Sequence, residues 1–296
     1  MKRTISILTC TAMLIGVLAV GCSGSGGGAE SPSNSSQPST GSETIKIASL
    51  HPMTGGSATR GQQFADSIQI AFDEINAAGG VKSMNGAQLE LVIADTASAP
   101  DTGVSQAERL ITVDGVSAIL GCFNSSVTFA VQDVVEKYGV PMVVMGAVKN
   151  EITERGYQYT FRCCNKASWD LDEIMSISDL VEEQGLEPIT SFGVIYESGD
   201  WGTDTANLIK EEAAERGWEC LVDESITTGV ADMTPQVLKL KAAQPDVVFV
   251  MVYTAENILF NQAYHANGVN LKYGMVCGGA EDAAFFDALS PEEYEG

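Results

Sequence analysis

Two adjacent serines offer the clearest candidate chemistry in the chain. Ser125 and Ser126 follow a short apolar stretch and open a segment with helical spacing, in the run GCFNSS at residues 121–126. Hydroxyl groups at a helix N-terminus, with free backbone N–H groups and the positive end of the helix dipole, can hold a carboxylate or a polar carbonyl. The simpler alternative is that either serine only caps the helix. Trp201 follows another apolar stretch, where its ring could stack on a ligand or only cover the end of a sheet.

The run GSATRG at residues 56–61 has the glycine spacing of a phosphate-binding loop. Two glutamines follow it instead of a lysine and a hydroxyl residue, so no side chain is placed to reach a terminal phosphate or magnesium. The run is therefore predicted to be a turn that leads from a strand into a helix with a free N-terminus.

Patterns typical of enzymes and metal sites are missing from the sequence. The two histidines, His51 and His265, are far apart, and no cluster of His, Asp, Glu or Cys has metal-ligand spacing. No Gly-x-Ser-x-Gly motif is present. The adjacent Cys163 and Cys164 could be redox-active, but neighbouring cysteines rarely reach disulfide geometry without strain. We expect no enzymatic activity, metal or cofactor, and we expect His51 in a solvated loop or at a pocket edge.

These candidates are positioned by alternating strand-like and helix-like segments. In residues 59–78, for example, Phe64, Ile68 and Phe72 recur at helical spacing before two glycines. The expected strands cover residues 44–49, 88–94, 117–120, 141–145, 192–196, 219–223, 247–252 and 273–277. The expected helices cover residues 59–78, 101–112, 125–138, 168–184, 202–216, 233–243 and 256–267.

Repeated strand–helix units indicate an α/β fold whose parallel sheets are covered on both faces. The strands are too many for one comfortable sheet. We therefore predict two doubly wound lobes, residues 44–165 and residues 166–296. Ligands of such sheets bind at the carboxyl ends of the strands, so the site is expected in the cleft between the lobes.

The charge of the chain excludes nucleic acid as a partner. Asp and Glu outnumber Lys and Arg by 39 to 16, which gives a formal net charge of -23. A protein that binds a nucleic-acid backbone needs a basic face. An anionic small ligand is not excluded, because the local field of a pocket matters more than the net charge.

The N-terminal residues have the features of an exported lipoprotein. Lys2 and Arg3 precede an uncharged apolar run that is short for a membrane span and typical of a secretory signal. The run ends in LAVGC at residues 18–22, which resembles the lipobox of bacterial lipoproteins. We predict a signal peptide over residues 1–21, lipidation at Cys22 and a flexible Gly/Ser tether over residues 22–43. The alternatives are an ordinary signal peptide or a short anchor helix.

Short runs spread over residues 44–296 together resemble one family. They include PMTG at residues 52–55, AFDEINAAGG at residues 71–80 and LKAAQPDVVF at residues 240–249. The chain resembles the type 1 periplasmic-binding proteins of branched-chain amino acid ABC transporters. The resemblance implies two α/β lobes joined by hinges that close on a small ligand, and it implies ABC permease subunits as partners.

The resemblance also implies a set of ligand-binding residues. Ser125 corresponds to the hydroxyl that holds the ligand carboxylate, and the backbone of the segment after residue 145 corresponds to the part that binds the amino acid head group. Trp201 corresponds to an aromatic lid, and Tyr253 to a second aromatic residue from the other lobe. The implied ligand-binding residues are Arg60, Ser125, Ser126, Gly146, Ala147, Val148, Trp201, Tyr253 and Glu281.

Three of these positions leave the class of ligand open. Val148 stands where amino-acid-binding members usually have Thr or Ser, and valine cannot accept a hydrogen bond from an ammonium group. Glu281 could pair with that ammonium, although it matches only with a shift in the alignment. Arg60 would favour a carboxylate if it points inward, but a surface position is equally compatible with the sequence. The expected ligand is a branched-chain amino acid, an amide or a small carboxylate.

Family members continue beyond the point where this sequence stops, so we expect a C-terminally incomplete fold that ends in a loop over residues 291–296.

The leading hypothesis is an extracytoplasmic solute-binding lipoprotein that is anchored to the bacterial cell membrane, in the periplasm or on the outer surface, and serves an ABC importer. The alternative is the ligand-sensing module of a signalling system on the same fold. The lipid signal favours transport, because a sensor usually needs a helix that spans the membrane.

Overall fold

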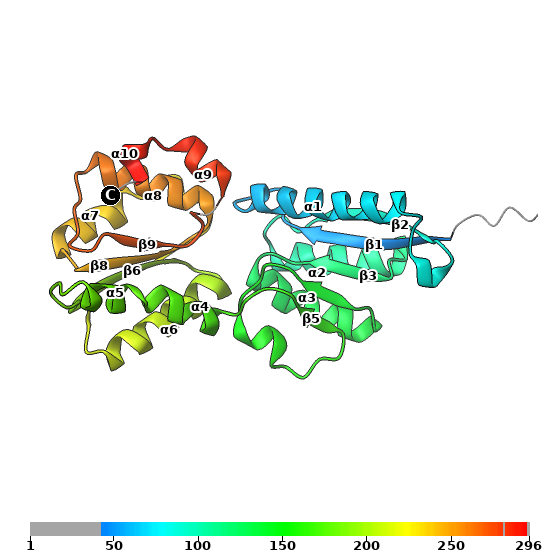
Figure 1. The fold of residues 1–296 in the computed structure, drawn as a ribbon, viewed down its shortest axis with the longest axis horizontal. Helices are drawn as coiled ribbons and strands as arrows, with labels where there is room; N and C mark the ends of the chain where they lie inside the picture. Colours follow the sequence, from blue (N-terminus) through cyan, green and yellow to red (C-terminus); the bar gives the residue numbers. More distant parts are fainter. Residues whose placement is uncertain (1–42, 281, 295–296) are drawn as a thin grey trace, which may run out of the picture. The chain divides into compact units, whose positions relative to one another are not determined.

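The computed structural model describes residues 43–280 and 282–294, without the side chains of residues 275–277. These residues form two parallel sheets (Figure 1). The strand order is β2-β1-β3-β4-β5 in the first sheet and β7-β6-β8-β9 in the second. The predicted signal peptide, tether and lipidation at Cys22 lie outside the described residues. The predicted fold class, two doubly wound parallel sheets, is confirmed.

Helices cover both faces of the first sheet. Its strands are β1 (Thr44–His51), β2 (Gln88–Asp95), β3 (Ala118–Gly121), β4 (Met142–Val144) and β5 (Thr160–Arg162). Helix α1 (Ala58–Ala77) lies on one face, while α2 (Pro100–Arg109) and α3 (Ser125–Tyr138) lie on the other (Figure 1). Leu50, Ile119 and Val131 are fully buried in the core beneath α2 and α3. Burial of such side chains is the main force that holds the helices on the sheet.

The second sheet is built in the same way. Its strands are β6 (Ser191–Glu197), β7 (Glu219–Ile226), β8 (Val247–Met251) and β9 (Met275–Cys277). Its helices are α4 (Ala167–Met175), α5 (Ile177–Glu183), α6 (Asp200–Glu215), α7 (Thr234–Ala243) and α8 (Thr254–Ala266). In Figure 1, α4, α5 and α6 lie on one face, and α7 and α8 lie on the other. Every residue of β8 is buried, as expected for a central strand covered on both faces.

The structure differs from the sequence prediction in several short segments. The single helix predicted over residues 168–184 is wrong, because the chain forms α4 and α5 with a break at Ser176. The Ser176 hydroxyl donates to the carbonyl of Glu173 at 2.6 Å, a local bond that competes with the helical pattern. The edge strand β5 has three residues and an exposed Phe161, so no apolar alternation marks it.

Short helical segments were also not expected from the sequence. They are η1 (Lys82–Met84), η3 (Asn150–Thr153), α9 (Ala283–Ala288) and α10 (Pro291–Tyr294). The loop predicted over residues 291–296 is therefore wrong for α10. The Glu293 side chain caps this helix: its Oε2 accepts from the Ser290 N–H at 2.8 Å and from the Ser290 hydroxyl at 3.0 Å. The helix predicted over residues 101–112 continues α2 into a π-helical segment, η2 (Leu110–Asp114).

The direction of the winding reverses once in each sheet. In the first sheet the chain moves from β1 outward to β2 and then returns to β3, so the reversal lies between β1 and β3. In the second sheet it lies between β6 and β8. Loops diverge to opposite faces at such a point, which leaves a crevice at the carboxyl ends of the two strands.

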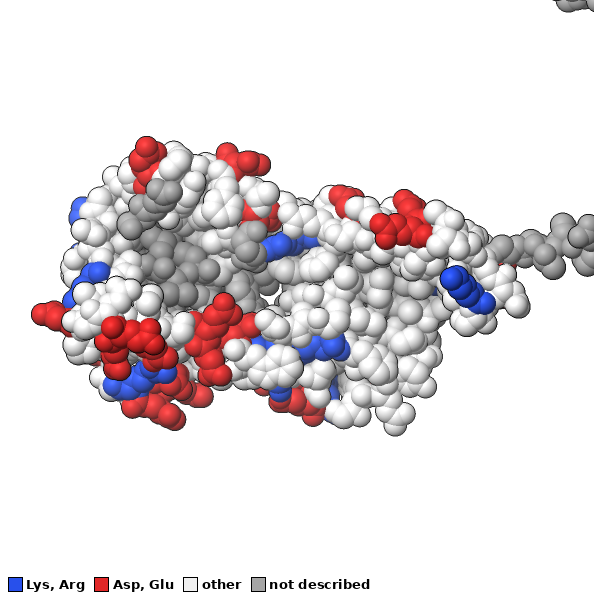
Figure 2. Space-filling model, viewed as in Figure 1, with Lys and Arg blue, Asp and Glu red and all other residues white. Residues whose placement is uncertain are grey.

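The surface is rich in acidic side chains. Figure 2 shows Asp and Glu gathered over the region of α4, α5 and α6, with fewer Lys and Arg on the same face. Within residues 43–280 and 282–294, no helix is long and apolar enough to cross a bilayer.

Candidate ligand-binding site

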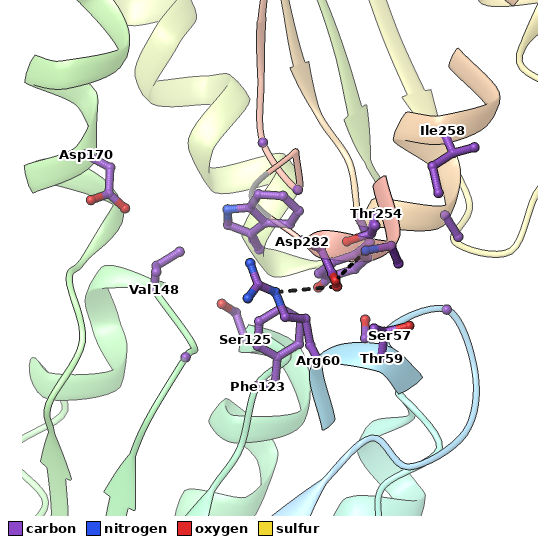
Figure 3. Close-up of a pocket in the computed structure, with 18 residues that line it drawn as sticks. Ser57, Thr59, Arg60, Phe123, Ser125, Val148, Asp170, Thr254, Ile258 and Asp282 are labelled. Carbon is purple, nitrogen blue, oxygen red and sulfur yellow. Dashed lines mark hydrogen bonds and ion pairs between the residues drawn. The ribbon is translucent and has the colours of Figure 1, made fainter. Parts of the chain in front are cut away.

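A cavity of about 320 Å³ opens where the carboxyl ends of strands from both sheets meet (Figure 3). Its walls come from segments that follow β1, β3 and β4 in the first sheet and β6, β8 and β9 in the second. This volume falls in the range of roughly 300–1,000 Å³ that is usual for small-molecule sites. Its lining includes Arg60, Phe123, Ser125, Gly146, Val148, Asp170, Trp201, Tyr253, Gly278 and Asp282.

Ser125 lies at the start of α3 and lines the cavity. Asn124, not a serine, is the N-cap residue, and its side chain makes no capping bond to the helix. The alternative that Ser125 or Ser126 caps the helix is therefore wrong. Ser125 Oγ accepts a hydrogen bond from the Lys149 N–H at 3.3 Å, which leaves its own proton to donate. A buried hydroxyl donor at a helix N-terminus suits an anionic group.

Arg60 projects into the cavity from the first turn of α1 (Figure 3). Its Nε lies 4.0 Å from Oδ2 of Asp282, and its Nη1 donates to Gln63 Oε1 at 3.3 Å. Of the two orientations that the sequence left open for Arg60, the structure has the inward one. A guanidinium beside the Ser125 hydroxyl makes this side of the cavity suitable for a carboxylate.

Asp282 is a site residue that the sequence analysis missed. Glu281, the predicted partner for an ammonium group, lies outside the described residues. Asp282 is 1% exposed, and its Oδ1 accepts hydrogen bonds from Gln63 Nε2 and from the Ala284 N–H, both at 3.1 Å. Its Oδ2 has no hydrogen-bond partner among the described residues. A buried carboxylate oxygen in this position can accept a hydrogen bond from a cationic ligand group.

Aromatic rings form the central wall of the cavity. The ring of Tyr253 lies 5.8 Å from that of Phe123 and 4.9 Å from that of Trp201, measured between centroids. Burial raises the pKa of Tyr253, so its hydroxyl stays protonated. Phe123 belongs to the first-sheet side and the other two rings to the second, so the aromatic contacts join the two sides. Trp201 and Tyr253 were predicted as site residues, whereas Phe123 was not.

The position of Trp201 is fixed by the buried Glu197 at the end of β6. Glu197 Oε2 accepts from the Gly199 N–H at 2.6 Å, and Oε1 accepts from the Gly202 N–H at 2.7 Å. A side chain at Gly202 would overlap the Glu197 carbonyl oxygen, so only glycine allows this close approach. Burial raises the pKa of Glu197, while the two backbone donors act to lower it.

The remaining predicted residues divide into two groups. Gly146 and Val148 line the cavity, and a side chain at Gly146 would meet the Phe123 ring. Ala147 and Ser126 are not among the lining residues. Ala147 is buried in the core, and its carbonyl accepts from Arg162 Nη1 at 2.9 Å.

Lys149 connects the segment after β4 with helix α6. Its Nζ lies 2.7 Å from Oδ2 of Asp204, 3.7 Å from Oδ2 of Asp200 and 3.4 Å from Oε2 of Glu151. Burial alone would lower the pKa of Lys149, but the three carboxylates together raise it. This ion cluster stabilises the approach of α6, which carries Trp201.

Among the described residues, no group of three His, Cys, Asp or Glu side chains is arranged to hold a metal ion. Cys122, Cys163, Cys164 and Cys220 are free thiols. The vicinal pair instead donates to backbone carbonyls, Cys163 to Val144 and Cys164 to Ala147, both at 3.4 Å.

His51 lies neither in a solvated loop nor at the cavity edge, so both expectations are wrong. It is 0% exposed, and its ring packs edge-on against Phe64 at a centroid distance of 4.7 Å. Nε2 has no hydrogen-bond partner among the described residues. Burial lowers the pKa of His51 to about 4, because a charged imidazole would lose its hydration there.

The His51→Phe variant is expected to lose less stability in mild acid than the wild-type chain. The unfolded state binds a proton at His51 below a pKa of about 6.5, whereas the native state resists protonation down to a pKa of about 4. The free energy of unfolding therefore falls by about 2 kcal/mol between pH 7 and pH 5 through this residue. Urea unfolding of both proteins at the two pH values measures the difference. An equal pH dependence would show that His51 is readily protonated in the native state.

The chain was compared with known proteins. A family model described as periplasmic binding protein matches residues 44–296. A Leu/Ile/Val-binding protein homolog of Brucella abortus is 34% identical over 242 residues, which are 79% of this chain and 58% of the relative. The substrate-binding protein LivJ of Streptococcus pneumoniae, solved with isoleucine, has a TM-score of 0.73 at 26% identity, over 85% of this chain and 69% of that chain.

A third match broadens the range of ligands among similar structures. It is a solute-binding protein of an ABC transporter from Rhodopseudomonas palustris, in complex with 3,4-dihydroxybenzoic acid. Its TM-score is 0.69 at 25% identity, and the match covers 80% of this chain and 62% of that chain. The chain thus spans less than two thirds of the length of the Brucella relative. The matches include proteins solved with an amino acid and with an aromatic carboxylate.

Proposed function

Because the chain belongs to the family of periplasmic binding proteins, we propose that it is an extracytoplasmic solute-binding lipoprotein that captures an amino acid for an ABC importer. Its partners would be permease subunits, and the lipid on Cys22 would hold it at the membrane in the periplasm or on the outer surface. Residues 44–165 and 166–296 would act as two lobes that close on the ligand. Closure is favoured because contacts from both lobes exist only in the closed state.

The observation that supports the proposal most strongly is that one cavity is lined by both a positive and a negative side chain, Arg60 and Asp282. Arg60, Ser125 and the N-terminus of α3 suit a carboxylate. Asp282, with one buried oxygen that lacks a hydrogen-bond partner, suits an ammonium group. A free amino acid carries both groups on one carbon atom and satisfies both sides.

The other two expected ligand classes fit this arrangement less well. An aromatic carboxylate could use Arg60 and Ser125, and it could stack on Trp201, but it would leave Asp282 Oδ2 without a donor. A simple amide would donate to Asp282 but has no carboxylate to place beside Arg60 and Ser125. Leaving a buried carboxylate oxygen without a hydrogen bond costs more than a neutral hydrogen bond contributes. The valine at position 148 does not exclude an amino acid, because Asp282 supplies the acceptor that Val148 lacks.

Calorimetric titration of the chain tests the proposal directly. The panel contains leucine, isoleucine, valine, norleucine, lysine, isobutyramide and 4-hydroxybenzoate. At least one amino acid is expected to bind, and Ser125→Ala and Trp201→Ala are each expected to weaken it about tenfold through loss of a hydrogen bond or of stacking. Ser126→Ala serves as the matched control, since Ser126 does not line the cavity. Tight binding of 4-hydroxybenzoate with no binding of amino acids would refute the proposed ligand class.

A further inference from the structure

A second cavity of about 150 Å³ lies behind Trp201 and shares a wall with the first. Asp170, Trp201 and Gly278 line both cavities. The benzene part of the Trp201 indole lies directly against Gly278, where an added side-chain carbon would be 3.0 Å from the ring. The shared lining places the second cavity directly beside the first, with Trp201 and Gly278 between them.

The walls of the second cavity suit a methylene chain. Ala167, Ile174 and Met251 contribute apolar surface from α4 and β8. Besides Asp170, the polar side chain in this lining is Thr205, on α6: it is 3% exposed, and its Oγ1 has no hydrogen-bond partner among the described residues. A buried hydroxyl without a partner costs free energy that a polar ligand atom would recover.

Asp170 adds a negative charge where the two cavities meet. It projects from α4 on the opposite side of the site from Asp282 (Figure 3). Its carboxylate interacts with Asn165, and no Lys or Arg among the described residues forms an ion pair with it. Burial raises the pKa of Asp170, because the carboxylate loses hydration there. A cation beside it would relieve this cost.

The charges of the described lining residues do not balance for a neutral ligand. Arg60 contributes one positive charge, and Asp170 and Asp282 contribute two negative charges. A neutral amino acid would use Arg60 and Asp282 and leave Asp170 uncompensated. A ligand with one further positive charge at the end of its side chain would pair with all three residues.

We propose that the ligand is an amino acid with an unbranched cationic side chain, of the lysine or ornithine type, whose end enters the second cavity between Asp170 and Thr205. This inference rests on the proposed function, because it specifies which side chain is carried by the amino acid that Arg60 and Asp282 hold. The methylene groups lie against Trp201, Ile174 and Met251. The terminal ammonium donates to the Asp170 carboxylate and to Thr205 Oγ1.

Titration with lysine, ornithine and norleucine tests the assignment, since norleucine keeps a four-carbon chain and lacks the terminal ammonium. Lysine or ornithine is expected to bind at least about tenfold more tightly than norleucine, as a charge-assisted hydrogen bond requires. Asp170→Asn should remove this preference and leave norleucine affinity unchanged. Thr205→Val should weaken the cationic ligands and not norleucine. Asp172→Asn, on the exposed side of α4, is the matched control.

The outcomes separate the two proposals. If norleucine or leucine binds as tightly as lysine, or if Asp170→Asn weakens all ligands equally, the second cavity does not bind a cationic group. The inference is then overturned, while the proposed function stands. If no amino acid binds to a chain that melts cooperatively, the proposed function fails and the inference fails with it.

Discussion

Replacing Asp282 by asparagine is expected to weaken binding of a free amino acid about 30-fold, which corresponds to the loss of about 2 kcal/mol from a charge-assisted hydrogen bond. The variant removes the charge opposite Arg60 but keeps an acceptor for Gln63 Nε2 and for the Ala284 N–H. Asparagine is also a good N-cap residue, so α9 should be retained. Titration with norleucine measures the effect.

A deaminated ligand separates this electrostatic role from a structural one. Hexanoate has the chain of norleucine without the ammonium group, so Asp282→Asn should not weaken its binding. Asp287→Asn is the control, because Asp287 is exposed on the same helix, α9. If norleucine and hexanoate lose the same affinity, Asp282 supports the loop and does not contact the ammonium.

The Gly61→Ala variant is expected to lose about 3 kcal/mol or more of stability, because its new methyl group would overlap the carbonyl oxygen of Pro52. Gly61 is buried in α1, and the backbone of the loop after β1 passes directly over it. Alanine has the higher helix propensity, which alone would stabilise the variant by up to about 1 kcal/mol. The two effects have opposite signs, so urea unfolding decides which one dominates.

Gln69→Ala provides the comparison for Gly61→Ala, since Gln69 is exposed on the same helix and its side chain only contacts Asp73. It is expected to change the free energy of unfolding by less than about 0.5 kcal/mol. A Gly61→Ala chain as stable as the wild type would mean that the loop at Pro52 moves aside without cost. The prediction assigns to Gly61 a role in the close packing of α1 against the loop at Pro52.

The sequence predicted the elements well where apolar periodicity is strong. The helix predicted over residues 125–138 has these bounds in the structure, and the strand predicted over residues 247–252 differs by one residue from β8. Prediction failed for β5, α9 and α10, which are too short to show a period. It also joined α4 and α5, because the break depends on one local bond of Ser176 and not on the apolar pattern.

The candidate site was predictable in part. Ser125 and Trp201 each follow a strand, so the rule for carboxyl ends of parallel strands was enough to select them, whereas Tyr253 was selected only through the family resemblance. Asp282 could have been found as a neighbour of Glu281 that precedes a helix and can act as its cap. Asp170 and Thr205 carried no such signal, because both lie within helices among other polar residues.

The sequence by itself determined which segments are strands and helices, and hence which loops lie at the carboxyl ends of the sheets. Periodicity is a local property, and it is read within a few residues. Only the tertiary structure decided that Arg60 points inward, that His51 is buried, and that Asp282 approaches Arg60 from 222 positions away along the chain. These relations depend on how two separately wound sheets pack against each other, and no local pattern encodes the distance between side chains on different sheets.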